Sequence, residues 1–435
     1  MASLSVDGLV SGLDTTALIS QLVTAEGATQ SRLKTRMSAT QTAATAYRSI
    51  NTKVEALRVA AEELTKATTW AAAKATSSSP AATVTASGTP QTGQLSFTVE
   101  SLATAHSTMS DDRWATTGTD FGAPQITFTT GGTTTTVDVG GTGTLSDAVK
   151  AINASSAGVT AAAVQLEDGQ YALMVTAKKT GVANSFSVGG AGTFSPLVTA
   201  TDARLRLGGP TGPAVTSATN TFSDLLAGGT ITVTATTTAP VTISVVADPE
   251  AVAAKVQSFV DAANAALSEI KKHSDNTSSS AVLKGDLTLS RLAGTILENV
   301  SKAVGTTSPV AAGVQLTRDG TVKFEKTTFL ASLASAPDVT QKLFAGSTVP
   351  AVQGIAQRLQ AVARTATDTT TGSLTILAKG KDALVKTYEK QIDDWDVRLA
   401  ARKQTLTRQF TAMETSLSTL KSQSSWLAGQ LASLS

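Results

Sequence analysis

Cysteine is absent from this chain of 435 residues, and histidine occurs twice, as His106 and His273. Without cysteine there can be no disulfide, no thiolate metal site and no cysteine nucleophile. Two histidines this far apart in sequence also argue against a histidine metal cluster. The sequence therefore gives no support to a metal, to a bound cofactor or to thiol chemistry.

Charge and aromatic side chains are also scarce, at 16% and 4% of the residues, and the net charge is only +2. Such a weak field does not attract nucleic acid or an anionic membrane. The charge is uneven, because residues 76–249 hold 6 Lys/Arg and 11 Asp/Glu, a net of −5, whereas the remainder has a net of +7. We therefore expect the middle of the chain and its two flanks to be different kinds of segment.

Long apolar runs are missing as well. No stretch approaches the roughly 20 apolar residues that span a bilayer, and we expect no insertion into a membrane. The first residues, MASLSVDGLVSGLDTT, lack the basic start and long apolar core of a secretory signal peptide. We expect a protein that is either cytoplasmic or exported by a route that does not read such a peptide.

The C-terminal 45 residues carry a regular apolar repeat. One stripe recurs every seven residues, and a second stripe, broken by Ser424, lies three residues before some members of the first. The residues of both stripes are Ile392, Leu399, Leu406, Phe410, Met413, Leu417, Leu420, Leu427, Leu431 and Leu434. This spacing is typical of a coiled-coil seam. Such a helix must pack on a partner, and the N-terminal segment is the nearest candidate.

Residues 15–66 have the pattern of one long helix, with Asp14 as its N-cap and Leu18, Ile19 and Leu22 on its first apolar face. Gly27 is the only glycine in this run, and proline is absent from it. We expect this helix to pair with the C-terminal one. Two alternatives remain open: a hairpin of a compact monomer, or ends that are loose in the free subunit and become ordered on assembly.

The sequence pattern changes to one typical of β-structure at about residue 76, where Ser77-Ser78-Ser79-Pro80 is expected to break the helix. Short runs of alternating Thr and Val between Gly and Pro indicate half-buried strands. We expect one short helix, at 145–153, and strands at 83–86, 95–99, 126–129, 137–139, 159–166, 171–175, 203–207, 230–235 and 241–246.

Helical patterns return after Pro249, at 250–272, 287–300 and 352–366, with a β-hairpin at Asp319-Gly320. The predicted fold class is α+β multidomain, with long terminal helices forming a coiled-coil stalk and β-rich domains inserted between them. The predicted divisions are a leader and terminal helix at 1–40, a stalk segment at 41–75, a discontinuous β-domain at 76–108 and 198–249, an outer β-domain at 109–197, a helical stalk domain at 250–395 and the heptad helix at 396–435.

The opening residues Gly8, Leu9, Ser11, Gly12, Leu13 and Asp14, followed by Leu18, Ile19 and Leu22, closely resemble the start of the flagellar filament-cap family (FliD, or hook-associated protein 2). Residues 145–182, with Ile152-Asn153, resemble the flagellin hook IN motif of flagellar axial proteins. Phe259-Val260 and Asn264 resemble the start of the second helical block in the cap family, although Ala263 stands where tyrosine is common.

This resemblance implies a non-enzymatic structural protein at the distal tip of the bacterial flagellum. It would be extracellular, exported without a cleaved signal peptide, and assembled as a homo-oligomeric ring. Its implied partners are flagellin, the flagellar type III export apparatus and a FliT-type export chaperone. The resemblance also implies that the opening motif acts in assembly or export, and that the heptad helix acts in assembly.

Two other kinds of function are alternatives to this one. The runner-up is another flagellar axial or junction protein, or an adhesive surface fibre. An enzyme would need a polar catalytic pair, and the candidates, Asp111-Asp112 and the carboxylates at 393, 394 and 396, fit solvated charges better. His106 is expected to be solvated, the glycine-rich run 140–143 to be a turn, and the four tryptophans to be packing anchors.

Overall fold

The computed structural model describes residues 12–86, 92–167, 169–209, 211–226, 228–347 and 352–432. The chain divides into two compact units. Unit 1 comprises Met1–Lys66 and Ala253–Ser435, and unit 2 comprises Ala67–Val252. Unit 2 is thus an insertion between the two parts of a helical unit.

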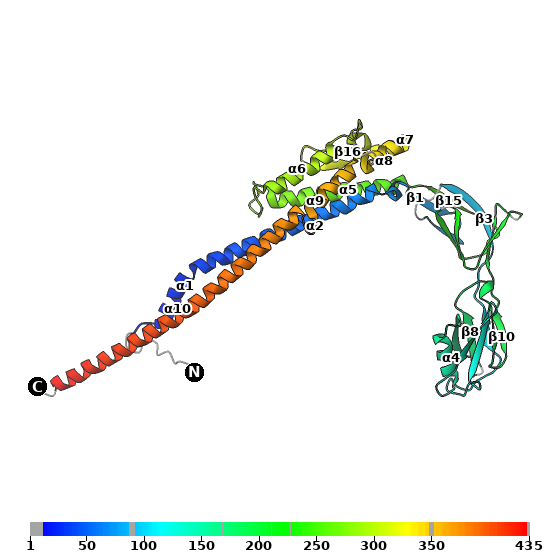
Figure 1. Ribbon diagram of the computed structural model, residues 1–435, viewed down its shortest axis with the longest axis horizontal. Helices are drawn as coiled ribbons and strands as arrows, with labels where there is room; N and C mark the ends of the chain where they lie inside the picture. Colours follow the sequence, from blue (N-terminus) through cyan, green and yellow to red (C-terminus); the bar gives the residue numbers. More distant parts are fainter. Residues whose placement is uncertain are drawn as a thin grey trace. The chain divides into compact units, whose positions relative to one another are not determined.

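Unit 1 is built on two long helices, α2 and α10, that lie side by side (Figure 1). Its elements are α1 (Thr15–Glu26), α2 (Ala28–Thr65), α5 (Pro249–Ser274), α6 (Leu287–Ser301), β16 (Val314–Leu316), β17 (Val322–Phe324), α7 (Lys326–Ser335), α8 (Pro337–Ala345), α9 (Ile355–Thr367) and α10 (Ser373–Ala432). The fold class predicted from the sequence, with paired terminal helices and an inserted β-rich middle, is confirmed.

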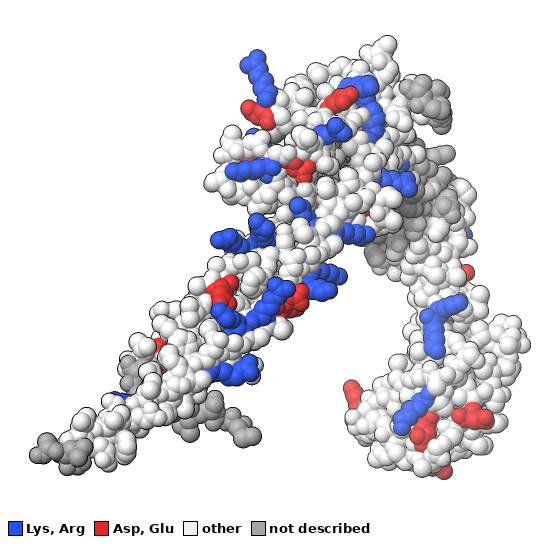
Figure 2. Space-filling model, turned by 60° about the vertical axis from the view of Figure 1, so that its left-hand side comes forward, with Lys and Arg blue, Asp and Glu red and all other residues white. Residues whose placement is uncertain are grey.

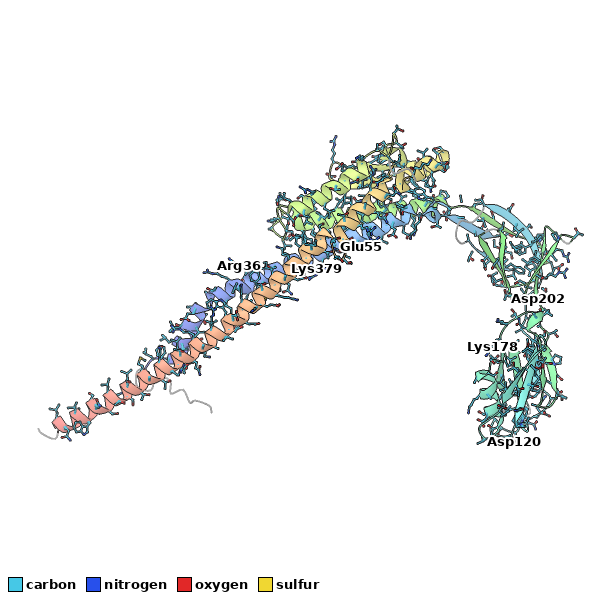
Figure 3. All side chains as sticks on the ribbon, viewed as in Figure 1. Arg36, Glu55, Asp120, Lys178, Asp202 and Lys379 are labelled. Carbon is cyan, nitrogen blue, oxygen red and sulfur yellow. The ribbon has the colours of Figure 1, made fainter. Side chains whose placement is uncertain are left out.

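The core of unit 1 begins along α2 at Ala43. From there the buried positions recur at helical spacing, and Ile50, Val54, Leu57 and Leu64 have no accessible surface. Burial of each such side chain stabilises the fold by about 1.5–3 kcal/mol. Polar contacts tie the same helix to its neighbours: Glu55, labelled in Figure 3, accepts a hydrogen bond from Thr367 Oγ1 at 2.7 Å.

The N-terminal helix differs from its prediction at one place. Asp14 is the N-cap of α1, as expected, and its carboxylate accepts from the Ala17 N–H at 2.8 Å. However, Gly27 interrupts the expected single helix, because glycine has the highest backbone entropy cost in a helix. The end of α2, at Thr65, lies within one residue of the predicted end at 66.

The predicted breaker at Ser77–Pro80 therefore does not end a helix. The residues before Pro80 form β1 (Ala73–Ser77), which pairs with β15 (Val241–Ala247). Residues 73–75, predicted as part of the stalk segment 41–75, therefore belong to a β-sheet. The predicted divisions at 40/41 and 395/396 fall inside α2 and α10, where neither helix is broken.

Unit 2 contains two β-modules with separate cores. The inner module is centred on Phe97, Leu205, Ile231 and Ile243. Its strands are β1, β2 (Ala82–Ala86), β3 (Gly93–Ser101), β11 (Ala203–Leu207), β12 (Ala214–Ser217), β13 (Thr221–Leu226), β14 (Gly229–Val233) and β15. They form a five-stranded sheet, β1-β15-β3-β11-β12, and a three-stranded sheet, β13-β14-β2.

The outer module packs helix α4 (Leu145–Ala154) and two further sheets around Phe128, Leu145, Ile152 and Leu173. Its strands are β4 (Ser107–Ser110), β5 (Gln125–Thr130), β6 (Thr133–Asp138), β7 (Val159–Gln165), β8 (Tyr171–Ala177), β9 (Phe186–Gly189) and β10 (Phe194–Val198). The sheet orders are β10-β4-β8-β7 and β6-β5-β9.

Candidate assembly surface

The proximal half of the α10 seam packs within the chain. Ile392 is 8% exposed and Leu406 is 6% exposed, while Leu399 is half-buried. Gly27 lies against this seam, because a Cβ at that position would make an ordinary contact with Leu399 Cδ1 at 3.5 Å. The predicted pairing of the C-terminal helix with the N-terminal one therefore holds at these positions.

A buried glutamine fixes the pairing of α2 with α10. The Gln30 Nε2 donates to Asp396 Oδ1 at 2.6 Å and to the Ile392 carbonyl at 3.3 Å, and the residue is 7% exposed. Arg402 Nε donates to Glu26 Oε1 at 2.9 Å one turn further along. The sequence offered no signal for Gln30, because it lies in a polar stretch and its partner is more than 360 residues away.

The distal half of the same seam is exposed. Met413, Leu420, Leu427 and Leu431 are 36%, 60%, 54% and 67% exposed, whereas Phe410 and Leu417 are half-buried. The expectation that the whole seam packs on the N-terminal segment is thus wrong over the described part of this half. Leu434 lies outside the described residues.

The antiparallel register explains where burial ends. Glu26 faces Arg402, so Thr15, eleven residues earlier in α1, lies near residue 413 of α10. α1 begins at Thr15, so no described turn of α1 lies beside the part of α10 that follows residue 413. Isolated exposed leucines are ordinary, but a stripe of them at heptad spacing is typical of an interaction face.

The N-terminal motif contributes a second apolar edge to this region. Thr15 and Ile19 are buried, while Leu13, Leu18 and Leu22 are 52%, 40% and 42% exposed. Gly12 has a φ of +72°, a conformation that favours glycine. The motif residues Gly8, Leu9 and Ser11 lie outside the described residues.

Charge is sparse where the leucines are exposed. Residues 409–432 of α10 include only Glu414 and Lys421 as charged side chains. In the view of Figure 2, coloured side chains alternate along the middle of the stalk and thin out towards its C-terminal end. We name the exposed stripe formed by Met413, Leu420, Leu427 and Leu431 the distal stripe.

One polar cluster in the described part of the chain contains the residue types of a catalytic triad. In this cluster Ser49 Oγ donates to Glu269 Oε1 at 2.6 Å, and His273 Nε2 lies 3.0 Å from the same oxygen. Hydrogen bonds from Ser49 first, and then from His273 and Lys272, hold the pKa of Glu269 below its usual value. The carboxylate stands between the hydroxyl and the imidazole, so this histidine cannot take a proton from that serine. The cluster ties α5 to α2.

The remaining candidates from the sequence are structural. Asp111 accepts from Ser195 Oγ at 2.8 Å, which lowers its pKa, and it is exposed. His106 is not simply solvated: its Nδ1 accepts the Phe186 N–H at 3.1 Å, and its ring lies 4.7 Å from that of Phe186. Trp114 is a buried anchor, as expected, but Trp426 is 65% exposed.

No cluster of three or more His, Asp or Glu side chains in the described ranges could hold a metal ion. Among the helices in those ranges, none combines the length and the apolar character needed to cross a membrane.

Three family models match the chain. Residues 200–422 match the C-terminus of flagellar hook-associated protein 2, residues 11–106 match its N-terminus, and residues 125–179 match the flagellin hook IN motif.

Individual relatives agree with these matches. The lateral flagellar hook-associated protein 2 of Vibrio parahaemolyticus is 32% identical over 267 residues, which cover 54% of this chain and 60% of the relative. Flagellar hook-associated protein 2 of Escherichia coli K12 is 30% identical over 196 residues, covering 43% and 41%. The matched regions thus span less than two thirds of these relatives.

The fold is similar to that in the crystal structure of the D1-D2-D3 domains of the flagellar cap protein FliD from Escherichia coli. The TM-score is 0.64 at 23% identity, and the alignment covers 78% of this chain and 99% of that one. At this identity the likeness concerns the fold.

Proposed function

Because this chain belongs to the flagellar hook-associated protein 2 family, we propose that it caps the distal tip of a bacterial flagellar filament. In this proposal several copies form a ring outside the cell, hold exported flagellin at the tip and promote its folding and insertion. The chain reaches the tip through the flagellar export apparatus with the help of a FliT-type chaperone. No bond is made or broken, so the protein is not an enzyme.

The observation that carries this proposal is the distal stripe. Leu420, Leu427 and Leu431 are more than half exposed on a helix whose earlier turns use the same heptad positions for packing. Exposed apolar surface of this kind is stabilised by an apolar partner, and burying one leucine contributes about 1.5–3 kcal/mol. The stripe therefore supports a chain that completes its packing when it joins an assembly.

The proposed mechanism uses the distal stripe, which is exposed in the free chain and is proposed to be covered in the assembly. The end of α10 is proposed to pack against subunits at the growing end of the filament and to be released when the cap moves on. Many weak apolar contacts suit repeated making and breaking better than one tight site, because each contact is non-directional. When a flagellin subunit is added, the distal stripe is proposed to leave its contact with one filament subunit and to pack against another.

An extracellular complementation experiment tests the proposal. The gene is deleted in its own host, leakage of flagellin into the medium is measured, and purified protein is then added outside the cells. We expect deletion to release flagellin and added protein to restore filament growth. Intact filaments after deletion would contradict the cap function and favour an adhesive surface fibre.

A further inference from the structure

One strand of the outer module has an unprotected edge. Among the described strands, β6 pairs only with β5 and lies at the end of the sheet β6-β5-β9. The two strands are joined by Gly131 and Gly132, with φ values of 56° and 83°, and the closing pair is Thr130 with Thr133. This is the geometry of a two-residue type I′ hairpin.

The hairpin register shows which backbone groups face outward. In such a hairpin the closing pair is hydrogen-bonded, and hydrogen-bonded and non-hydrogen-bonded pairs alternate along the ladder. The N–H and C=O groups of Thr134 and Thr136 therefore point away from β5. Their side chains are exposed too, and the two strands are linked by Thr129 and Thr134, whose Oγ1 atoms are 2.8 Å apart.

The other sheet edges of this module are blocked. β10 contains Pro196 and a register shift between Pro196 and Val198. β7 is clamped by Asn153, whose amide donates to the Ala161 carbonyl at 2.9 Å and accepts the Ala161 N–H at 2.8 Å. β9 has four residues. Prolines, irregularities and short length are the usual protections against strand addition, and β6, with the sequence TTTTVD, has none of them.

We propose that β6 pairs antiparallel with β6 of a second copy of this chain, about a twofold axis at Thr135. This register places Thr134 opposite Thr136 of the other copy, so the free backbone groups of both strands meet. Residues 133–137 are uncharged, so no like charges face each other. The two Asp138 carboxylates fall at opposite ends, roughly 20 Å apart from the strand rise, which is about two Debye lengths in physiological salt.

The strand also limits how tight this contact can be. Six residues span about 20 Å, and a single strand pair buries far less than the 1,200 Å² or so of a stable interface. The contact is therefore transient between free chains.

Disulfide trapping tests the proposal, and the chain, which has no cysteine, needs no background mutations. In the proposed register Thr135 faces Thr135 of the other copy in a non-hydrogen-bonded pair. The Cα atoms of such a pair are about 4.5 Å apart, which suits a disulfide. Under mild oxidation we expect purified Thr135→Cys to form a disulfide dimer at least tenfold faster than Thr160→Cys. Thr160 is exposed on the clamped edge strand β7 of the same module. The two cysteine variants therefore collide equally often in solution and differ in the strand that carries the thiol.

A second substitution separates strand pairing from chance collision. Thr136→Pro removes an outward N–H while leaving the β5–β6 ladder intact, because proline is tolerated at such edge positions. Adding it to Thr135→Cys should abolish the tenfold advantage. Equal rates for Thr135→Cys and Thr160→Cys, or an advantage that survives Thr136→Pro, would overturn the proposal.

Amide exchange of the unmodified protein gives an independent measurement. The Thr134 and Thr136 amides should become more protected as protein concentration rises. Protection that is already present and independent of concentration would mean that another part of the same chain covers the edge. Protection that appears only on adding flagellin would mean that a different partner occupies it. Either result would overturn pairing with a second copy.

Discussion

The side-chain amide of Asn264 is bonded to the backbone of Val322 through both of its polar atoms. Nδ2 donates to the Val322 carbonyl and Oδ1 accepts the Val322 N–H, each at 2.8 Å. The amide thus behaves like one more residue of a neighbouring strand and joins α5 to β17. Asn153 makes the same pair of bonds to Ala161, and Asn220 makes it to Ala103, at 3.0 and 2.7 Å.

Loss of the Asn264 clamp should destabilise unit 1. Asn264→Ala removes both partners of Val322, and we expect the free energy of unfolding to fall by about 1–3 kcal/mol. Urea denaturation followed by circular dichroism measures this. Asn299→Ala is the matched control, because the Asn299 amide bonds only within its own helix, to the Thr295 carbonyl at 2.8 Å. An equal effect of the two substitutions would refute the clamp.

The corresponding change in unit 2 should affect a different transition. Asn153→Ala lies in the outer module, whereas Asn264→Ala lies in unit 1. We expect differential scanning calorimetry to show that each substitution lowers the melting temperature of its own unit. A single transition shifted equally by both would contradict the division into two units.

Acid should weaken the start of α4 through one carboxylate. Hydrogen bonds from Thr144 and then Thr142 lower the pKa of Asp147 to about 2, from an ordinary value of 3.8. The stabilisation is present above pH 3.8 and is lost as the pH falls through about 2, because the unfolded state binds the proton first. We expect Asp147→Asn to remove this part of the acid dependence when unit 2 is unfolded by urea between pH 5 and pH 2. Superimposable pH profiles would argue against it.

The exposed end of α10 should be the first site of proteolysis in the free protein. Residues 418–431 of α10 are all exposed, so local unfolding there breaks few apolar contacts. Brief trypsin digestion with mass spectrometry should show cleavage after Lys421 before cleavage after Lys53, which lies beside the core of α2. Lys421→Gln serves as the control for assignment of the fragment. Earlier cleavage at Lys53 would show that the order of stability is different.

The sequence predicted those elements whose side-chain periodicity is regular. The heptad spacing predicted α10 and its packing at Ile392 and Leu406, and alternation predicted strands such as β5 and β8. It did not predict where packing ends, because Leu406 and Leu420 occupy equivalent heptad positions and differ only in whether a partner lies beside them. That difference depends on how far α1 extends.

Other features could not be predicted because they depend on distant residues. β4 and β10 lack alternation, and β10 contains Pro196, which an edge strand tolerates. Asn153 and Asn264 stood out by resemblance, but their bonds to backbone groups 8 and 58 residues away became visible only in the fold. Gln30 gave no local sign of its contact with Asp396.

The central claim is that the distal stripe is the assembly surface of a filament cap. Its most direct test adds purified Leu420→Asp/Leu427→Asp protein to cells that lack the gene, and measures filament length. Leu287→Asp is the matched control, because Leu287 is 80% exposed in the same unit but lies on α6. We predict filaments of normal length with the unmodified protein and with Leu287→Asp, and none with the double variant, although its circular dichroism is unchanged. Normal filaments with Leu420→Asp/Leu427→Asp would contradict the claim.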